Sequence, residues 1–495
     1  MGVVKKQGIA NSVWIYIGLA LGYLNMAVLM AKFLSTENLG ARQVLFQAGD
    51  FFSVIALVGL RNIINRFFPS YDNKEKKHNG FLVFILGYWL IGTIISSLIL
   101  IVCKDFVLSY YEEKSNILNG LYFVIIPFGA SMALFQALAA YSTSLLKSTM
   151  PIFIREVGQR IFTSLLLALV IFEIINFETF MVWYLVSYVI ALFVLIFYLV
   201  KLGQFKIYFS KQYEWVSKIK EMTVFGLFTW FNNAMQILVK TADVLMLGAA
   251  SGLASAGIYG IGALVGNIVQ VPSQSLRQIG APLISRYFKE NNLNEVGNLY
   301  RKTCMIQLIA GLFIYLLILV NMDALFTIWR KEFEVGKTVI IYLGLARLVS
   351  GSTGLNGRII VESKYFRWNF YFNLILGILV VTSNYILIPK YGILGASLAS
   401  ALSIVSTSML KVLFVYIKFG LQPFSSKSIL AILIGLGAFG AAYFVPLTNI
   451  FVADILLKTS IFCVIFIPLV IRSKLSTDAN EMVYNGVKKI RKILS

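Results

Sequence analysis

The chain has very little of the residue types on which most catalytic and metal sites depend. It contains one histidine, His78, and three cysteines, Cys103, Cys304 and Cys463, among 495 residues. These are too few and too scattered for a metal cluster or a disulfide framework. The sequence also lacks a phosphate-binding loop, a carboxylate pair and a nucleophile elbow. We therefore expect no catalytic residues, no metal site and no cofactor, which disfavours an enzyme or an ATP-driven pump.

Charged residues are scarce too, and the chain has no hydrophilic stretch long enough for a soluble catalytic domain. Hydrophobic residues make up 59% of the sequence and charged residues 13%. This composition is typical of a membrane protein. The net charge of +21 does not point to nucleic acid, because basic cytoplasmic loops that face anionic lipid headgroups explain it. The protein therefore acts within or across the bilayer.

Long apolar segments are what the sequence has in abundance. Most reach the roughly 20 residues that a helix needs to span the hydrocarbon core. They predict about fourteen transmembrane helices, at residues 8–31, 43–68, 80–103, 117–145, 157–173, 179–200, 222–248, 257–284, 303–321, 338–357, 369–388, 392–416, 429–446 and 455–471.

Basic residues alternate between plentiful and scarce from one loop to the next. Residues 174–178 and 249–256 contain no Lys or Arg, whereas the stretch 201–221 carries five. Because basic loops stay in the cytoplasm, this alternation predicts a multi-pass protein with both termini cytoplasmic.

The sequence indicates an internal repeat. Gly40 and Gly257 each follow a short polar turn and open an apolar segment, with Arg61 and Arg277 about twenty residues further on. An even number of segments separates the copies, so the repeats are parallel. We predict a six-helix bundle with the start of a linker at 1–210, a second six-helix bundle at 211–420, and two extra helices with a basic, interfacial tail at 421–495.

Four short stretches carry a family resemblance over essentially the whole chain. They are Gly8-Ile-Ala-Asn-Ser12, the turn from Phe33 to Gly40, Asp243-Val-Leu-Met-Leu-Gly248 with Gly257-Ile-Tyr259, and Pro389-Lys-Tyr-Gly-Ile-Leu-Gly-Ala396. The chain resembles Wzx-type polysaccharide flippases of the multidrug/oligosaccharidyl-lipid/polysaccharide (MOP) exporter superfamily. It departs from the pattern at Ala41-Arg42, where the family often has a Tyr two residues after the Gly.

Polar side chains recur at helical spacing inside the apolar segments. Thr229, Asn232, Gln236, Lys240 and Asp243 share one face of a predicted helix, as do Asn267, Gln270, Gln274 and Arg277. Asp50 and Arg61 are 11 residues apart and so fall on nearly the same face. Such faces must meet protein or a wet cavity, because lipid leaves them unsatisfied.

The charged residues can be ordered by their predicted depth in the membrane. Arg61 and Arg277 lie towards the cytoplasm, Arg347 near the middle, Lys240 further out, and Asp50 and Asp243 near the outer ends. Purely structural interpretations stay open. Lys240 and Asp243 could neutralise each other, and Arg61 and Arg277 could reach lipid headgroups. The polar faces could form ordinary interhelical hydrogen bonds.

The resemblance implies a secondary transporter that carries an undecaprenyl-diphosphate-linked oligosaccharide from the inner to the outer leaflet of a bacterial cytoplasmic membrane. Arg61, Arg277 and Arg347 would then contact the diphosphate, Lys240 would also bind the substrate, and Asn232, Gln236, Gln270 and Gln274 would bind the sugars. Asp50 or Asp243 would bind a coupling proton or sodium ion, and a polysaccharide polymerase complex is a further partner. The alternatives are a lipid II flippase, a multidrug and toxin exporter, and a membrane scaffold for glycan synthesis.

Overall fold

A computed structural model describes residues 2–72, 77–111, 120–208, 213–446 and 451–475 of the chain, and these ranges contain helices and no strand. The predicted interfacial helix near the C-terminus lies outside them. The chain forms two compact units, Met1–Gly260 and Ile261–Ser495. The predicted domain boundaries at 210 and 420, like the internal repeat, stay predictions.

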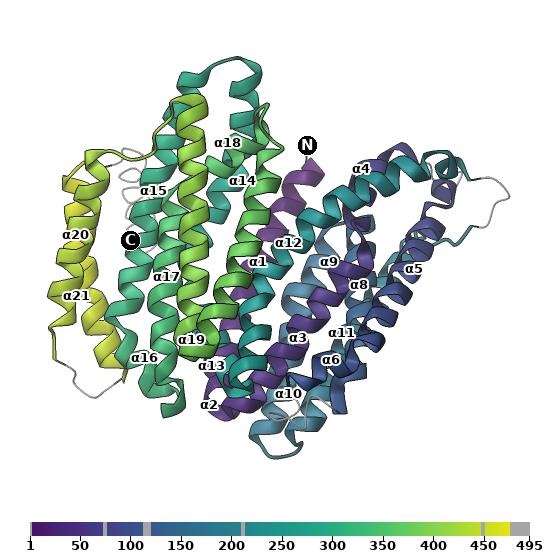
Figure 1. Ribbon diagram of the computed structural model, residues 1–495, viewed down its shortest axis with the longest axis horizontal. Coiled ribbons are helices and arrows are strands. Elements are labelled where there is room, and N and C mark those ends of the chain that lie inside the picture. Colours follow the sequence, from purple (N-terminus) through teal and green to yellow (C-terminus); the bar gives the residue numbers. More distant parts are fainter. Residues whose placement is uncertain (1, 73–76, 112–119, 209–212, 447–450, 476–495) are drawn as a thin grey trace. The chain divides into compact units, whose positions relative to one another are not determined.

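The first unit contains the helices up to the middle of α13 (Figure 1). They are α1 (Gly2–Tyr23), η1 (Leu24–Met30), α2 (Ala31–Phe33), α3 (Thr36–Leu57), α4 (Leu60–Phe67), η2 (Phe68–Ser70), η3 (Lys77–Gly80), α5 (Phe81–Val102), α6 (Lys104–Ser109), η4 (Tyr122–Val124), α8 (Ile125–Ser144), α9 (Thr149–Phe153), η5 (Ile154–Gly158), α10 (Gln159–Ile171), α11 (Phe177–Lys201), η6 (Glu214–Lys218), α12 (Ile219–Ser251) and α13 (Leu253–Asn267).

The second unit holds the remaining helices. They are η7 (Ile268–Gln270), α14 (Val271–Lys289), α15 (Leu293–Val320), α16 (Met322–Ile328), η8 (Lys331–Gly336), α17 (Lys337–Ser352), α18 (Asn356–Glu362), α19 (Trp368–Phe419), α20 (Ser426–Tyr443) and α21 (Phe451–Arg472).

Ten helices in the described ranges are long and apolar enough to cross a membrane, and up to twelve if each of two bent pairs counts as one span. One of the ten, α19, has 52 residues, roughly twice what a bilayer requires. Its backbone breaks at Gly392, where φ is 55° and ψ is −127°, so it contains both predicted segments 369–388 and 392–416. The predicted all-α polytopic fold is confirmed.

The second predicted segment is a broken helix. α3 ends at Leu57, α4 begins at Leu60, and the two are bent by 49°. Gly59 between them has a φ of 77°, a conformation that glycine adopts without a steric cost. A Cβ atom there would also overlap the carbonyl oxygen of Gly226 on α12. Glycine at this position therefore both allows the break and lets α12 approach it.

The two glycines of the predicted repeat lie against each other. Ser35 caps α3 by accepting a hydrogen bond from the amide of Asn38, and Gly40 follows in the second turn. A Cβ atom on Gly40 would overlap the carbonyl oxygen of Leu253, and one on Gly257 would overlap that of Thr36. The first turns of α3 and α13 therefore cross at backbone contact distance.

Buried apolar side chains hold each unit together. In the first unit the rings of Phe68, Phe81 and Tyr141 pack edge to face. In the second unit one cluster joins α15, α20 and α21 around Phe462 and Phe466. A second cluster surrounds Tyr300, which is 1% exposed. These clusters fix the helices that carry the polar residues described below.

Candidate functional site

A charged pair joins α3 to α12 in the first unit. Lys240 Nζ lies 2.8 Å from Asp50 Oδ2. The Asp50 side chain is 14% exposed and that of Lys240 is 59% exposed. Lys240 therefore pairs with Asp50, which is 190 residues away in the sequence. The sequence had left open a pairing of Lys240 with Asp243, one turn along the same helix.

Asp243 has a different partner. Its carboxylate accepts a short hydrogen bond from the hydroxyl group of Tyr259 on α13. Both residues are buried, with Asp243 7% and Tyr259 2% exposed. A carboxylate bonded in this way is held in place and shielded from bulk solvent.

The remaining polar residues of the predicted face, Thr229, Asn232 and Gln236, all lie on α12. Thr229 donates its hydroxyl hydrogen bond to backbone carbonyls of its own helix, at 3.0 Å from Phe225 and Gly226. Asn232 is half-buried, and Gln236 is exposed. The side chain of Gln236 is therefore more accessible than that of Asn232.

The predicted shared face of Asp50 and Arg61 is wrong. The prediction assumed one straight helix, but the break at Val58 and Gly59 separates the two residues. Arg61 lies in the first turn of α4, where it is exposed. Its guanidinium group is repelled by that of Arg155.

Three basic side chains lie within electrostatic range of Arg277 on α14 in the second unit: Arg347 on α17, Arg358 on α18 and Lys411 on α19. We call these four residues the basic cluster. Arg277 is repelled by the charges of Arg347 and Arg358, and Lys411 is repelled by Arg277. All four are half-buried.

Neutral side chains orient two members of the basic cluster. Arg347 Nε donates a hydrogen bond to Asn267 Oδ1 at 2.7 Å, and Arg277 Nη2 donates one to Ser273 Oγ at 2.8 Å. These contacts fix the guanidinium groups without cancelling their charge. An anion is the species that would relieve the repulsion among them.

Arg277 and Arg347 were predicted as site residues, and the structure brings them together. The sequence analysis missed Arg358 and Lys411. Arg358 follows the predicted segment 338–357 by one residue. Lys411 lies inside segment 392–416, so the criterion that singled out the other intramembrane charges would have found it. Gln270 is half-buried at the end of η7, and Gln274 on α14 is exposed.

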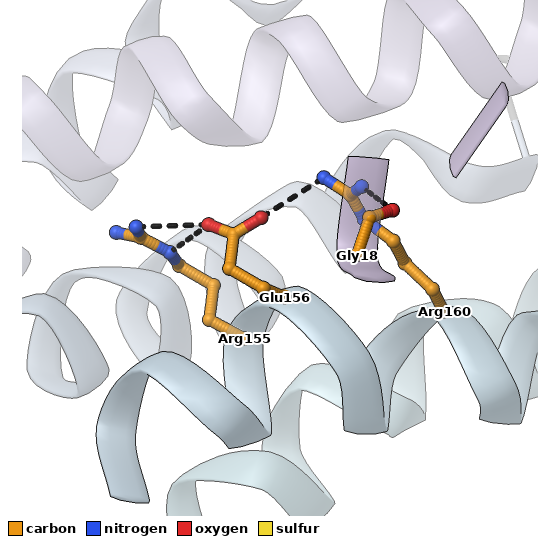
Figure 2. A network of polar contacts seen from close by, with 4 residues as sticks. All are labelled: Gly18, Arg155, Glu156 and Arg160. Atoms are coloured by element: carbon orange, nitrogen blue, oxygen red, sulfur yellow. Dashed lines mark hydrogen bonds and ion pairs between the residues drawn. The ribbon is translucent and has the colours of Figure 1, made fainter. Parts of the chain in front are cut away.

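Two further charged groups were missed. Figure 2 shows Glu156 between two arginines: one carboxylate oxygen lies 2.9 Å from Arg155 Nη2, and the other lies 3.0 Å from Arg160 Nη2. Arg160 also donates a short hydrogen bond to the carbonyl oxygen of Gly18 on α1. This network ties α1 to η5 and α10.

The second missed group lies on α21. Asp454 and Lys458, four residues apart, are each 4% exposed, and their spacing places them on one helix face. In the described part of the chain no group of three His, Cys, Asp or Glu side chains is arranged to hold a metal ion.

No profile of a known protein family matches the chain. It is similar to the capsular polysaccharide biosynthesis protein CapF of Staphylococcus aureus, with 26% identity over 207 residues, which are 42% of this chain and 52% of that protein. The chain thus spans about half the length of this curated relative.

Two solved transporter structures are also similar. One is the lipid II flippase MurJ in an inward closed conformation, with a TM-score of 0.62 and 17% identity over 94% of this chain and 100% of MurJ. The other is an inward-facing multidrug resistance MATE family transporter of the MOP superfamily, with a TM-score of 0.62 and 13% identity over 83% of this chain and 98% of that one. The chain is thus a multi-pass membrane protein with the fold of the MOP superfamily, as its resemblance predicted.

Proposed function

We propose that the protein is a secondary transporter, not an enzyme, which moves an undecaprenyl-diphosphate-linked oligosaccharide from the inner to the outer leaflet of the cytoplasmic membrane. The basic cluster carries this proposal. Guanidinium groups suit bidentate contacts with phosphate oxygens, and a diphosphate supplies negative charge that would relieve the repulsion between Arg277 and the other three members of the cluster. Within the first unit, Arg61 is a further phosphate contact, Lys240 a substrate contact, and Asn232 and Gln236 bind sugar hydroxyl groups. Within the second unit, Gln270 and Gln274 bind sugar hydroxyl groups.

The named relatives support the cargo class. CapF takes part in capsular polysaccharide biosynthesis, and MurJ is a lipid II flippase. Both names point to lipid-linked or surface glycans. The basic cluster disfavours a multidrug exporter of cationic compounds, because those cargoes would be repelled by it.

The coupling ion is assigned to a carboxylate of the first unit. Asp243, held by Tyr259 in a buried position, and Asp50, paired with Lys240, are the two candidates. Coupled transport requires a carboxylate that gains and loses a cation during the cycle. A buried carboxylate meets that requirement best, so Asp243, which is 7% exposed, is the first choice.

The test compares cluster variants in proteoliposomes that contain a fluorescent, short-chain polyprenyl-diphosphate sugar. We expect Lys411→Met and Arg358→Gln each to slow translocation by about tenfold, because a hydrogen bond to a charged group contributes roughly 1.5–3 kcal/mol and exposure reduces that value. Lys418→Met is the matched control. It removes the same charge from the same helix at an exposed position outside the cluster.

A rate equal to that of the parent protein in the Lys411→Met and Arg358→Gln variants would contradict the proposal. Export of a cationic dye by the same proteoliposomes, with no movement of the lipid-linked sugar, would favour the multidrug exporter instead. Comparing lipid II with a capsular-type oligosaccharide lipid separates the two glycan cargoes.

A further inference from the structure

The only histidine of the chain is buried just before α5 and contacts two separate segments of the first unit. His78 lies in η3 and is 6% exposed. Its Nδ1 atom lies 3.0 Å from Oδ1 of Asp72, which follows η2. Its Nε2 atom lies 2.7 Å from Oε1 of Gln204, which follows the end of α11. We call these three residues the histidine latch. None of them is assigned above to the cargo or to the coupling ion.

Both partners of the His78 ring present acceptors to it. A carboxylate accepts hydrogen bonds, and Oε1 is the carbonyl oxygen of the Gln204 side chain. A neutral imidazole carries one N–H group, whereas an imidazolium carries two. Only the protonated ring therefore has a donor for each partner at once. The contact with Asp72 is an ion pair that lacks hydrogen-bond alignment, so its strength depends on the charge of the ring.

The backbone that carries His78 adopts an uncommon conformation. His78 and Asn79 both have a φ of 52°, and Gly80 after them has a φ of 69°. Residues other than glycine reach this left-handed region only at a steric cost. Such strained residues persist where surrounding contacts hold them, and they concentrate in segments that change conformation. The side-chain contacts of His78 help to hold η3 in this state, so their loss lets η3 relax.

η3 supports the segment that leads into α12. A Cβ atom on Gly80 would overlap the ring of Tyr213, so these two residues are in close contact. The Tyr213 ring stacks on that of Trp215 at a centroid distance of 4.9 Å, and Trp215 packs on Phe84 of α5 at 5.2 Å. Trp215 belongs to η6, which α12 follows directly. A change in η3 therefore reaches the beginning of α12, the helix that carries Asp243.

The other titratable groups around the latch keep their charge near neutral pH. Tyr141 of α8 packs edge to face on the His78 ring, and its hydroxyl group donates a hydrogen bond to the backbone carbonyl of Gln204 at 3.0 Å. Lys201 and Lys206, on either side of Gln204, are exposed. Tyrosine and lysine stay protonated and carboxylates stay ionised in this range. Among the described residues around the latch, the histidine is therefore the group that changes charge there.

We propose that the histidine latch is a pH-sensitive device that fastens Gln204, at the start of the stretch between α11 and α12, to η3. At low pH the charged ring donates to Gln204 and attracts Asp72, so the latch is closed. As the pH rises through the titration of the ring, one donor and the attraction to Asp72 are lost, and η3 relaxes. Acidification on the cytoplasmic side, where the basic loops place this end of the helices, therefore closes the latch. The device concerns the conformation of the protein and not its cargo, so it stands apart from the proposed function.

The experiment follows the latch with spin labels on the full chain in nanodiscs. In a cysteine-free background, nitroxide labels are attached at Lys206→Cys and at Thr143→Cys on α8, two exposed positions. Double electron–electron resonance gives the distances between them at about pH 5.5 and about pH 8.5, on either side of the value of roughly 6.5 at which a free histidine titrates. We expect one narrow distance population at the lower pH, and about a threefold loss of that population at the higher pH.

Two variants and a control identify the responsible group. His78→Gln removes the titratable ring and should give the same distance distribution at both pH values. Asp72→Asn removes the ion pair from a side chain that is 43% exposed, and it should lower the narrow population at the lower pH by about twofold or more. This variant decides the question if His78→Gln does not fold. Glu221→Gln, the matched control, removes an exposed carboxylate from the first turn of α12 and should behave as the parent protein does.

Equal distance distributions at the two pH values in the parent protein would overturn the proposal. A pH response that persists in His78→Gln would overturn it as well, because another group would then be the sensor. An equal loss of the narrow population in Glu221→Gln and Asp72→Asn would assign the effect to surface charge in general and would overturn the role of this ion pair.

Discussion

At the scale of single residues, the charges inside the membrane are organised by partners that the sequence does not place nearby. Lys240 pairs with Asp50 on another helix, and Asp243 accepts from Tyr259. An isolated charge in the bilayer costs roughly 2.5–3.5 kcal/mol on insertion scales. Pairing across helices therefore both lowers that cost and fixes which helices lie together.

The Asp50 and Lys240 pair gives the first prediction. Asp50→Asn leaves the lysine without its counter-charge and should lower accumulation in the membrane. The expected cost is about 1–2 kcal/mol, below the roughly 3–5 kcal/mol of a fully buried pair, because Lys240 is 59% exposed. Asp50→Asn combined with Lys240→Gln should restore accumulation, measured by quantitative blotting. Normal accumulation of the single variant would show that the pair has no structural role.

Asp243 gives the second prediction. The amide oxygen of Asp243→Asn can still accept from Tyr259, so accumulation should stay normal while net transport stops through loss of the titratable group. Asp243→Leu removes the acceptor of the buried Tyr259 hydroxyl hydrogen bond, so accumulation should fall as well. Transport in proteoliposomes and blotting separate the two effects. Normal transport by Asp243→Asn would remove Asp243 as the coupling residue.

At the scale of helices, breaks decide which side chains share a face. The second predicted segment becomes α3 and α4 because Gly59 adopts a φ of 77°. The long helix α19 breaks at Gly392, where φ is 55° and ψ is −127°. In both cases glycine permits backbone angles that other residues reach only with strain.

The break at Gly59 gives the third prediction. Gly59→Ala adds a Cβ atom that meets the backbone of Gly226 and strains the positive φ, so it should destabilise the fold by about 1–3 kcal/mol. Gly87→Ala on α5 is the matched control, because no atom lies within 4 Å of its added Cβ. It should be neutral or slightly stabilising. Thermal unfolding in detergent measures both, and equal melting temperatures would contradict the assigned role of Gly59.

At the scale of the whole molecule, the chain is a succession of membrane helices arranged as in MOP superfamily transporters. Its proposed transport role depends on which ends of these helices face the cytoplasm. The alternation of basic loops predicts that orientation through the positive-inside rule.

Cysteine labelling tests the orientation and is the fourth prediction. In a cysteine-free background, Ile174→Cys, which is 66% exposed between α10 and α11, should react with an impermeant thiol reagent added outside intact cells. Lys218→Cys, exposed in η6, should react only after the cells are opened. Labelling of Lys218→Cys in sealed cells would reverse the topology.

The sequence by itself determined that the chain is a succession of membrane helices, because hydropathy is a local property that each stretch of chain carries alone. The superfamily fold was implied by the resemblance of four short motifs. The sequence also identified Arg277 and Arg347 as unusual, since a charge in an apolar run is visible without coordinates. Only the tertiary structure decided the partners. The Asp50 and Lys240 pair and the basic cluster join residues from separate helices, and their contacts depend on how those helices are rotated. Neither is encoded in the spacing along one helix, so the shared face predicted for Asp50 and Arg61 failed where the helix bends.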